Sequence, residues 1–195
     1  INKIEYKNNQ NLIEIGDILK IDVMSMVPEA AEPFNKPLTN SFSNNNLNIL
    51  KLDGYLVNND AKIKFPIIGN IAVTGHDIFS LEKKITKLLI EGGHLTNPLV
   101  KVRRLNSKFT LLGEIKNPGT YSYQDKSLNI FQAIGYGGDL TILGKRKNIT
   151  LIRQSNNLRV VHKIDLTDAT ILSKPYFEIK NNDVIIVDPN FSKVK

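Results

Sequence analysis

Apolar and polar residues alternate after Gly16-Asp17, so that Leu19, Ile21 and Val23 share one face. A period of two is that of a half-buried β-strand, and a Gly-Asp turn is a common way to begin one. Over residues 28–48 the alternation stops, and three prolines and an Asn-rich tract replace it. The pattern predicts a strand followed by a long surface loop over about 28–48, a length typical of functional loops.

Two further alternating runs are centred on Tyr55 to Val57 and on Ile63 to Phe65. The polar tripeptide Asn58-Asn59-Asp60 lies between them and favours a hairpin turn. Pro66 then stands where a strand ends, and a missing backbone N–H is tolerated at such a position.

The best helical pattern covers residues 77–91. Its apolar residues recur at three- and four-residue steps on one face: Ile78, Leu81, Ile85, Leu88 and Leu89. Asp77 is a suitable N-cap, and Gly92-Gly93 can end the helix in left-handed conformations. The apolar stripe is that of a helix buried on a sheet, and the opposite face bears lysines and is a candidate contact for a neighbouring subunit. A strand is predicted from Leu99, directly after Pro98.

The stretch from Phe109 to Gly138 reads as strand, turn, strand and helix. The turn is the segment 113–119, Tyr121 and Tyr123 alternate as in a strand, and Ser127 begins a helix-like pattern that ends at Gly137-Gly138. We interpret the glycines and the proline as a structural turn motif, because Pro fixes φ and Gly permits positive φ. The motif consists of Gly113, Pro118, Gly119, Gly137 and Gly138.

Three more strands are predicted at 149–153, 158–164 and 184–187, with Asn156-Asn157 as a hairpin turn. A polar turn that ends in Asp183 comes before the last of them. It resembles the turn that ends in Asp17 near the front of the chain, and we interpret the likeness as shared turn chemistry rather than a repeat.

Several segments resemble a known family, in family order and over nearly the whole chain. The segments 15–23, 65–75 and 97–102 resemble landmarks of the polysaccharide export domain. The segments 111–121 and 127–138 resemble the turn and helix of the SLBB domain, a soluble ligand-binding β-grasp module. The resemblance implies an α+β protein with two small domains, 1–106 and 107–195. Each is expected to be a mixed sheet with one main helix, the second β-grasp-like.

The function implied by the resemblance is export of capsular or exopolysaccharide through an oligomeric ring at the periplasmic face of the bacterial outer membrane. The implied partners are the polysaccharide, further copies of the chain and an inner-membrane polysaccharide co-polymerase. The chain starts at Ile1 and reads as an excised segment. The resemblance puts a signal sequence and a lipidated Cys upstream, and it allows a membrane-spanning helix beyond Lys195. The alternative is a periplasmic glycan- or small-ligand-binding β-grasp module that forms no channel. A third, weaker reading is a carbohydrate-active enzyme.

Composition narrows these classes. The 195 residues carry a net charge of +7, which suits nucleic acid, an anionic membrane or an acidic glycan. With no Trp and 7% aromatic residues there is no stacking platform for single-stranded nucleic acid, and no nucleic-acid partner is expected. The absence of Cys excludes disulfides, and no apolar run reaches the roughly 20 residues of a membrane helix.

The densest basic run is Lys145-Arg146-Lys147, which we interpret either as a solvated loop before a strand or as a small anion or glycan contact. His76, His94 and His162 lie apart, without the spacing of a zinc site. Asp165 and Asp168 could form an acid pair like that of a glycosidase. The simpler reading is that Asp165 ends a strand and Asp168 caps a turn. We therefore predict no catalytic residue, no cofactor and no metal.

Overall fold

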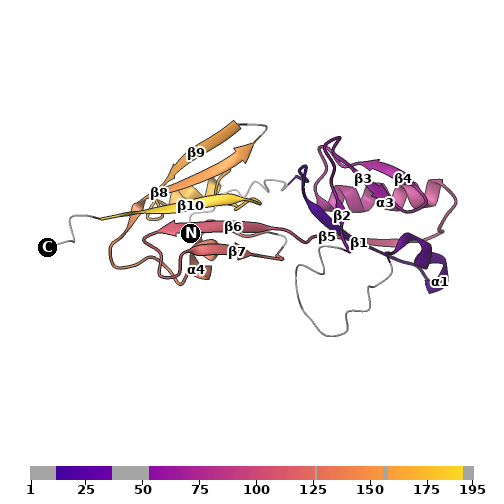
Figure 1. Ribbon diagram of the computed structural model, residues 1–195, viewed down its shortest axis with the longest axis horizontal. Helices are drawn as coiled ribbons and strands as arrows, with labels where there is room; N and C mark the ends of the chain where they lie inside the picture. The colour runs from indigo at the N-terminus through magenta and orange to yellow at the C-terminus, as the bar shows by residue number, and fades with distance from the viewer. Residues whose placement is uncertain (1–11, 37–52, 126, 156–157, 191–195) are drawn as a thin grey trace. The chain divides into compact units, whose positions relative to one another are not determined.

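The computed structural model describes residues 12–36, 53–125, 127–155 and 158–190. The chain divides into two compact units, and each unit has a hydrophobic core of its own. The N-terminal unit is Gln10–Asn106, and the C-terminal unit contains Ser107–Lys195. Figure 1 labels the helices and strands of both units.

The N-terminal unit is built on a three-stranded antiparallel sheet. Its central strand is β1 (Ile18–Met24), flanked by β2 (Tyr55–Leu56) and β5 (Leu99–Arg104). A separate antiparallel hairpin is formed by β3 (Lys62–Phe65) and β4 (Gly69–Ala72). The strands predicted after Gly16-Asp17 and Pro98 are thus confirmed.

Helix α3 (Ile78–Glu91) closes the core of this unit. Leu81, Ile85 and Leu89 are fully buried, and the predicted helix and its apolar face are confirmed. Asp77 is the N-cap, and a reciprocal pair of hydrogen bonds joins it to Ser80. At the other end only Gly93 has a positive φ, 68°, whereas Gly92 stays right-handed, so the prediction for Gly92 was wrong.

The predicted loop over 28–48 is wrong in its first part. Residues there form α1 (Pro28–Ala31) and the 3-10 turn η1 (Glu32–Phe34), and Ala31 and Phe34 are buried. The prolines misled the sequence reading, because a proline in the first turn of a helix removes no intrahelical hydrogen bond. The rest of the predicted loop, from residue 37, lies outside the described residues.

The turn predicted at 58–60 exists, but it does not join a hairpin. The Asn58 side chain accepts hydrogen bonds from the N–H groups of Asp60 and Lys62. The strands on either side then belong to different sheets, because β2 pairs with β1 while β3 pairs with β4. Local turn chemistry was readable from the sequence, and strand partners were not.

The C-terminal unit contains a mixed five-stranded sheet in the order β7-β6-β10-β8-β9. The strands are β6 (Lys108–Gly113), β7 (Gly119–Ser122), β8 (Gly144–Ser155), β9 (Leu158–Ile164) and β10 (Asp183–Pro189). Only β6 and β10 run parallel, and the other pairs are antiparallel. The hairpin turn predicted at Asn156-Asn157 lies outside the described residues.

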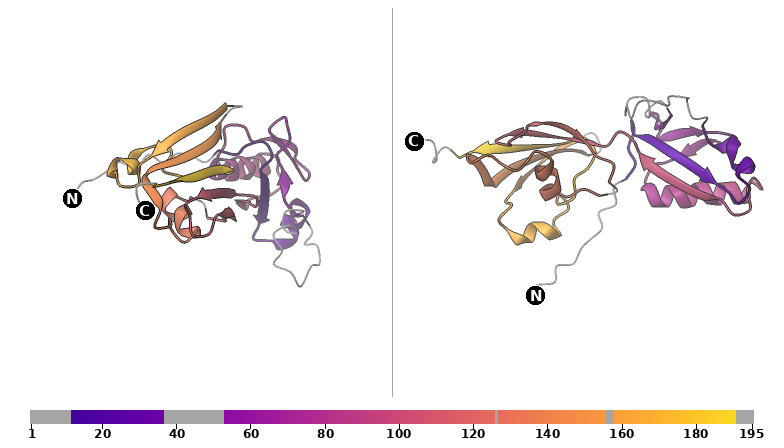
Figure 2. Two further views of the ribbon diagram at one scale, coloured as in Figure 1. Left: turned by 60° about the vertical axis from the view of Figure 1, so that its left-hand side comes forward. Right: turned by 90° about the horizontal axis from the view of Figure 1, so that it is seen from below.

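Two helical segments cover one face of this sheet, α4 (Ile130–Tyr136) and the 3-10 turn η2 (Ala169–Ser173), as Figure 2 shows. Helix α4 begins at Ile130, and its N-cap is Asn129 rather than Ser127, since Asn129 and Gln132 exchange capping hydrogen bonds. Within the unit the strand order is second-first-fifth-third-fourth, with the helix after the second strand. That is the β-grasp-like arrangement that the sequence resemblance implied.

The α+β class with a sheet and a main helix in each unit is confirmed. The two units differ in their sheets, however. The described pairings of the N-terminal unit are all antiparallel, and the C-terminal sheet is mixed.

A buried carboxylate stands at the start of a central strand in each unit. In the C-terminal unit Asp183 receives two hydrogen bonds from Arg153 of β8, at 3.0 Å from Nε and 2.7 Å from Nη2. In the N-terminal unit Asp17 lies 2.9 Å from Nε of Arg104 of β5. All four side chains are buried, so these are the desolvated, well-paired charges whose loss is most costly.

The likeness between the two turns extends to their hydrogen bonds. The Asp17 side chain accepts the N–H of Glu14, and the Asp183 side chain accepts the N–H of Lys180. In each turn the Asp N–H also donates a hydrogen bond to the carbonyl of the residue three positions earlier, Glu14 or Lys180. The shared turn chemistry is confirmed, and the structure adds the arginine partners, which the sequence pattern did not indicate.

Removing one partner of the buried pair in the C-terminal unit is expected to destabilise it strongly. Arg153→Met leaves the Asp183 carboxylate buried without its cation, and we expect a loss of about 3–5 kcal/mol in urea unfolding followed by circular dichroism. The matched control is Arg146→Met, which breaks the exposed pair with Asp139 and should cost about 1 kcal/mol or less. Equal effects of the two variants would contradict this account.

The cap of α3 gives a second expectation, with a pH dependence. Hydrogen bonding from Ser80, first from its side chain, holds the pKa of Asp77 below its ordinary value. A depressed pKa means that the stabilisation is present above the unfolded-state pKa and is lost as pH falls through the folded-state pKa. Asp77→Ala should therefore cost about 1 kcal/mol at pH 7, and less at pH 3.

Asp77→Asn is the control for that measurement, because an amide oxygen still caps the helix but does not titrate in this range. Urea titrations at both pH values should show Asp77→Asn close to the parent chain at pH 7. An Asp77→Ala effect that stays constant from pH 7 to pH 3 would show that the charge plays no part.

Candidate functional site

The predicted turn motif of the C-terminal unit forms one packed junction between the β6–β7 loop (113–119) and the segment that follows α4 (137–144). We call it the turn junction. Three backbone hydrogen bonds connect its two parts: Asn117 N–H to Gly137 O, Lys116 N–H to Asp139 O, and Thr141 N–H to Glu114 O. The Thr141 hydroxyl also donates to the Glu114 carboxylate. In the sequence β7 and α4 lie between these two segments, and the hydrogen bonds hold the segments together.

Two glycines of the junction are required by space, and one of them by conformation as well. Gly113 has a φ of 79°, and an added Cβ would overlap the Val187 carbonyl of β10. Gly137 has a negative φ, but a Cβ there would lie 2.5 Å from Ile115 Cγ2. Gly138 follows with a φ of 76°. These three members of the predicted motif lie together and serve the packing of the junction.

The remaining two members of the motif contribute less. Gly119 begins β7 and does not have a positive φ, so the expectation of a left-handed residue there was wrong. The nearest atom to an added Cβ is Tyr121 Cε2 at 4.0 Å. Gly119 pairs with Leu111 as an ordinary strand residue, which explains its extended conformation. Pro118, directly before it, is exposed in the turn.

The basic run Lys145-Arg146-Lys147 belongs to strand β8 and not to a loop, so that reading was wrong. The pairing of β8 extends to Gly144, opposite Pro189, which carries the strand further than its apolar part predicts. All three side chains are exposed. The register between β8 and β10 shifts at this point, since Pro189 lies opposite Gly144 and Val187 opposite Ile149, so regular strand alternation does not assign the three side chains to faces.

Nearby carboxylates offset part of this positive charge. Arg146 Nη2 donates to Asp139 Oδ2 at 2.8 Å, at the edge of the turn junction. The Leu140 N–H first, and then Arg146, hold the pKa of Asp139 below its ordinary value. Asp165 has a lowered pKa mainly because Thr167 donates to it, and Lys147 adds a smaller effect. Lys145 and Lys147 are the cations of the run best placed for weak contact with an anion.

The acidic pair considered for glycosidase chemistry is used in turns. Asp165 follows β9 and accepts hydrogen bonds from the Thr167 N–H and hydroxyl. Asp168 caps η2 and accepts from the Thr170 N–H and hydroxyl. The simpler reading, a strand end and a turn cap, is confirmed for both residues.

A serine, a histidine and an aspartate do meet at the start of α3, but not as a catalytic triad. In a triad the aspartate orients the histidine, whereas the Asp77 carboxylate here accepts from the Ser80 N–H. The Ser80 hydroxyl lies between the Asp77 backbone groups and His76 Nδ1, 3.3 Å away. Burial first, and then Lys84, lower the pKa of His76. The arrangement is that of a helix cap.

The other two histidines pack against aromatic rings, His94 against Phe34 and His162 against Tyr176. Over the stretches 12–36, 53–125, 127–155 and 158–190, no three His, Asp or Glu side chains converge as metal ligands.

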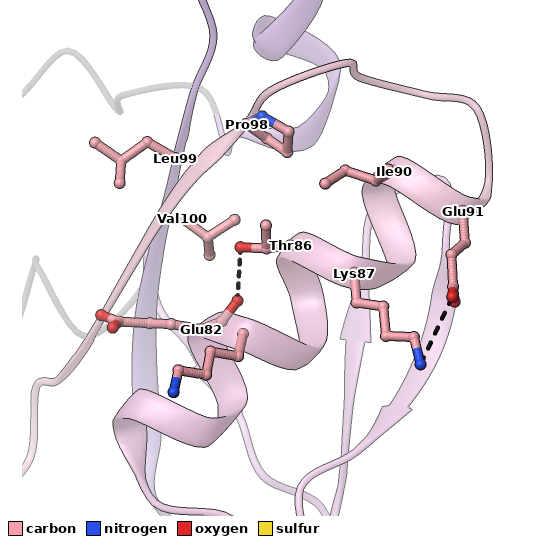
Figure 3. Close-up of a pocket in the computed structure, with 9 residues that line it drawn as sticks. Glu82, Thr86, Lys87, Ile90, Glu91, Pro98, Leu99 and Val100 are labelled. Atoms are coloured by element: carbon pink, nitrogen blue, oxygen red, sulfur yellow. Dashed lines mark hydrogen bonds and ion pairs between the residues drawn. The ribbon is translucent and has the colours of Figure 1, made fainter.

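An open groove of about 560 Å³ lies between α3 and β5 in the N-terminal unit. We call it the α3–β5 groove, and Figure 3 shows its lining: Glu82, Lys83, Thr86, Lys87, Ile90, Glu91, Pro98, Leu99 and Val100. Ile90 is 47% exposed and Leu99 is 54% exposed. Glu82 fixes one wall of the groove. Its carboxylate accepts a hydrogen bond from the N–H of Val102, and this N–H lies on the outer edge of strand β5. The groove can hold an apolar side chain.

Sequence reasoning missed this groove for a physical reason. The pattern marked α3 as a buried stripe with a lysine-bearing opposite face, and Lys83 and Lys87 of that opposite face line the groove. Ile90 was not part of the predicted apolar face and Leu99 was predicted only as the start of a strand, and only the approach of β5 to the helix shows that both border an open space.

The packing of the turn junction can be tested by replacing one glycine inside it, and one glycine outside it, with alanine. Gly113→Ala forces a Cβ against the Val187 carbonyl at positive φ, and the expected loss is about 2–5 kcal/mol in urea unfolding. Gly135→Ala is the control, since no atom lies within 4 Å of an added Cβ in α4 and alanine favours a helix by roughly 0.5–1 kcal/mol. Opposite signs of the two changes are expected, and similar destabilisation by both would contradict the packing described.

Comparison with known protein families identifies the chain. The model of the family described as "Polysaccharide biosynthesis/export protein" matches residues 5–104, about half of the sequence and nearly all of the N-terminal unit. Among the described residues, no helix has the length and apolar character needed to cross a bilayer. The match agrees with the resemblance carried by the Gly16-Asp17 strand and the segments after it. The chain belongs to the polysaccharide biosynthesis/export protein family, whose role is in polysaccharide export or biosynthesis.

Proposed function

We propose that the chain is the periplasmic part of an outer-membrane translocon that exports capsular or exopolysaccharide through a ring of identical subunits. The observation that carries the proposal is the order of its parts. A unit that matches the export family over residues 5–104 is followed directly by a five-stranded unit with β-grasp-like strand order. That order is the one that the sequence resemblance assigns to an export domain followed by an SLBB domain.

The chemistry of the described residues suits a passive role. The acids and the Ser80–His76 contact that could suggest catalysis are used in turns and a helix cap. A path for a polymer must bind weakly enough to release it, so shallow contacts serve better than an enclosed pocket. Lys145 and Lys147, both exposed on β8, are candidates for such weak glycan contact.

The remaining parts of the proposal concern partners. The subunits are held at the outer membrane by segments outside this chain, among them a lipidated Cys upstream. Energy and gating come from an inner-membrane polysaccharide co-polymerase, and the chain itself makes or breaks no covalent bond. No nucleic acid takes part.

The intact protein extracted in detergent gives the direct test. Electron microscopy should show closed rings with a central opening, because head-to-tail contacts between identical subunits close into rings when the rotation permits. Deletion of the gene should abolish surface polysaccharide and leave synthesis of the polymer precursor in place.

Compact monomers at high concentration would contradict the translocon. They would favour the alternative, a glycan- or small-ligand-binding module without a channel, and calorimetric titration with soluble glycan fragments would then show saturable binding.

A further inference from the structure

The tip of the β3–β4 hairpin holds an isoleucine in a conformation that isoleucine rarely adopts. Ile67 has a φ of 63°, in the left-handed region, and it is branched at Cβ. The Ile68 N–H donates to the Pro66 carbonyl at 2.6 Å, which closes a three-residue turn around it. Positive φ is a real outlier for a β-branched residue, and Gly or Asn would adopt it more readily. Residues strained in this way concentrate at sites of function.

The surrounding residues hold this tip in place while Ile67 itself points outward. Phe65 is fully buried, and Ile68 packs against the core of the N-terminal unit. Ile67 is 60% exposed. Since the Ile67 side chain does not pack in its own core, the folding of the unit does not explain why an isoleucine stands there. The three-residue turn fixes the position of this exposed apolar side chain.

The same unit carries an open groove suited to such a side chain. The α3–β5 groove is bordered by Ile90, Pro98 and Leu99, and it is open to solvent. Its rim carries Glu82 and Glu91, while Lys64 stands exposed three residues before the tip. Lys83 and Lys87 also lie on the rim, so charge contributes modestly and the apolar lining supplies most of the attraction.

The described part of each copy thus bears a strained apolar projection at Ile67 and an apolar groove in the same unit. A projection that enters the groove of the next copy makes a head-to-tail contact, and such contacts generate rings or filaments. The rim pair of Lys87 and Glu91, 3.6 Å apart and exposed, is weak enough to exchange partners with an incoming Lys64.

We propose that Ile67 at the β3–β4 tip inserts into the α3–β5 groove of a second copy of this chain, and that this contact joins neighbouring subunits. The inference rests on the proposed function in one respect, the existence of an oligomer, and it names the surfaces that form it.

The first experiment separates association from folding. Ile67→Gly relieves the left-handed strain, so the melting temperature of the chain should rise by about 4 °C. It also removes the projection, so self-association measured by sedimentation equilibrium should weaken at least about tenfold. Leu99→Ser, in the groove, should weaken association similarly. Val161→Ser is the control, because Val161 is 57% exposed on β9 of the other unit, and it should leave association unchanged.

The second experiment uses the absence of Cys from the sequence. The double variant Ile67→Cys with Leu99→Cys should give a ladder of disulfide-linked multimers on non-reducing gels, in the purified chain and in the intact protein. Ile67→Cys with Val161→Cys is the matched pair and should give no ladder. A ladder from the control pair alone, or equal ladders from both, would overturn the proposed contact.

The outcomes distinguish this inference from the proposed function. Rings of the intact protein that persist in Ile67→Gly and Leu99→Ser would overturn the contact and leave the translocon standing. A specific ladder from the first pair without closed rings would support the contact and contradict the translocon. Absence of any self-association in the parent protein would overturn both.

Discussion

The structure depends on a buried carboxylate at the start of a central strand in each unit. Asp183 is held by two nitrogens of Arg153 and by the N–H of Lys180, and Asp17 by Arg104 and by the N–H of Glu14. A buried charge is tolerated only when its hydrogen-bonding capacity is filled. The turn, the strand that follows it and the neighbouring strand must therefore keep one register, or a charge is left unpaired in the core.

That constraint fixes the two candidate surfaces, the α3–β5 groove and the turn junction. In the N-terminal unit the Asp17 pair joins β1 to β5, and the position of β5 against α3 defines the groove beside Leu99. In the C-terminal unit the Asp183 pair joins β10 to β8, while Gly113 lets β6 approach β10 closely enough for the turn junction to form. Rigid surfaces of this kind suit the proposed translocon, whose subunits would contact a polymer and one another.

Local features of the fold were predictable from the sequence, and contacts between distant segments were not. The period of α3, its Asp77 cap and the two Asp turns follow from side-chain spacing and turn chemistry. The partner of Asp17 is Arg104, far along the chain, and no local pattern marks it. Lys145 was misread because β8 starts at Gly144, which pairs with Pro189 of β10, and no apolar pattern marks that start. The positive φ of Ile67 is a property of the folded backbone, and nothing in the amino-acid composition indicates it.

Hydrogen exchange of two turn amides tests the central role of the buried carboxylates most directly. The N–H groups of Glu14 and Lys180 lie in surface turns but donate to Asp17 and Asp183, so they should exchange as slowly as the amides of core strands. The Thr167 amide donates to the exposed Asp165 in a similar turn and should exchange fast. If Glu14 and Lys180 exchange as fast as Thr167, the buried carboxylates do not hold the units together.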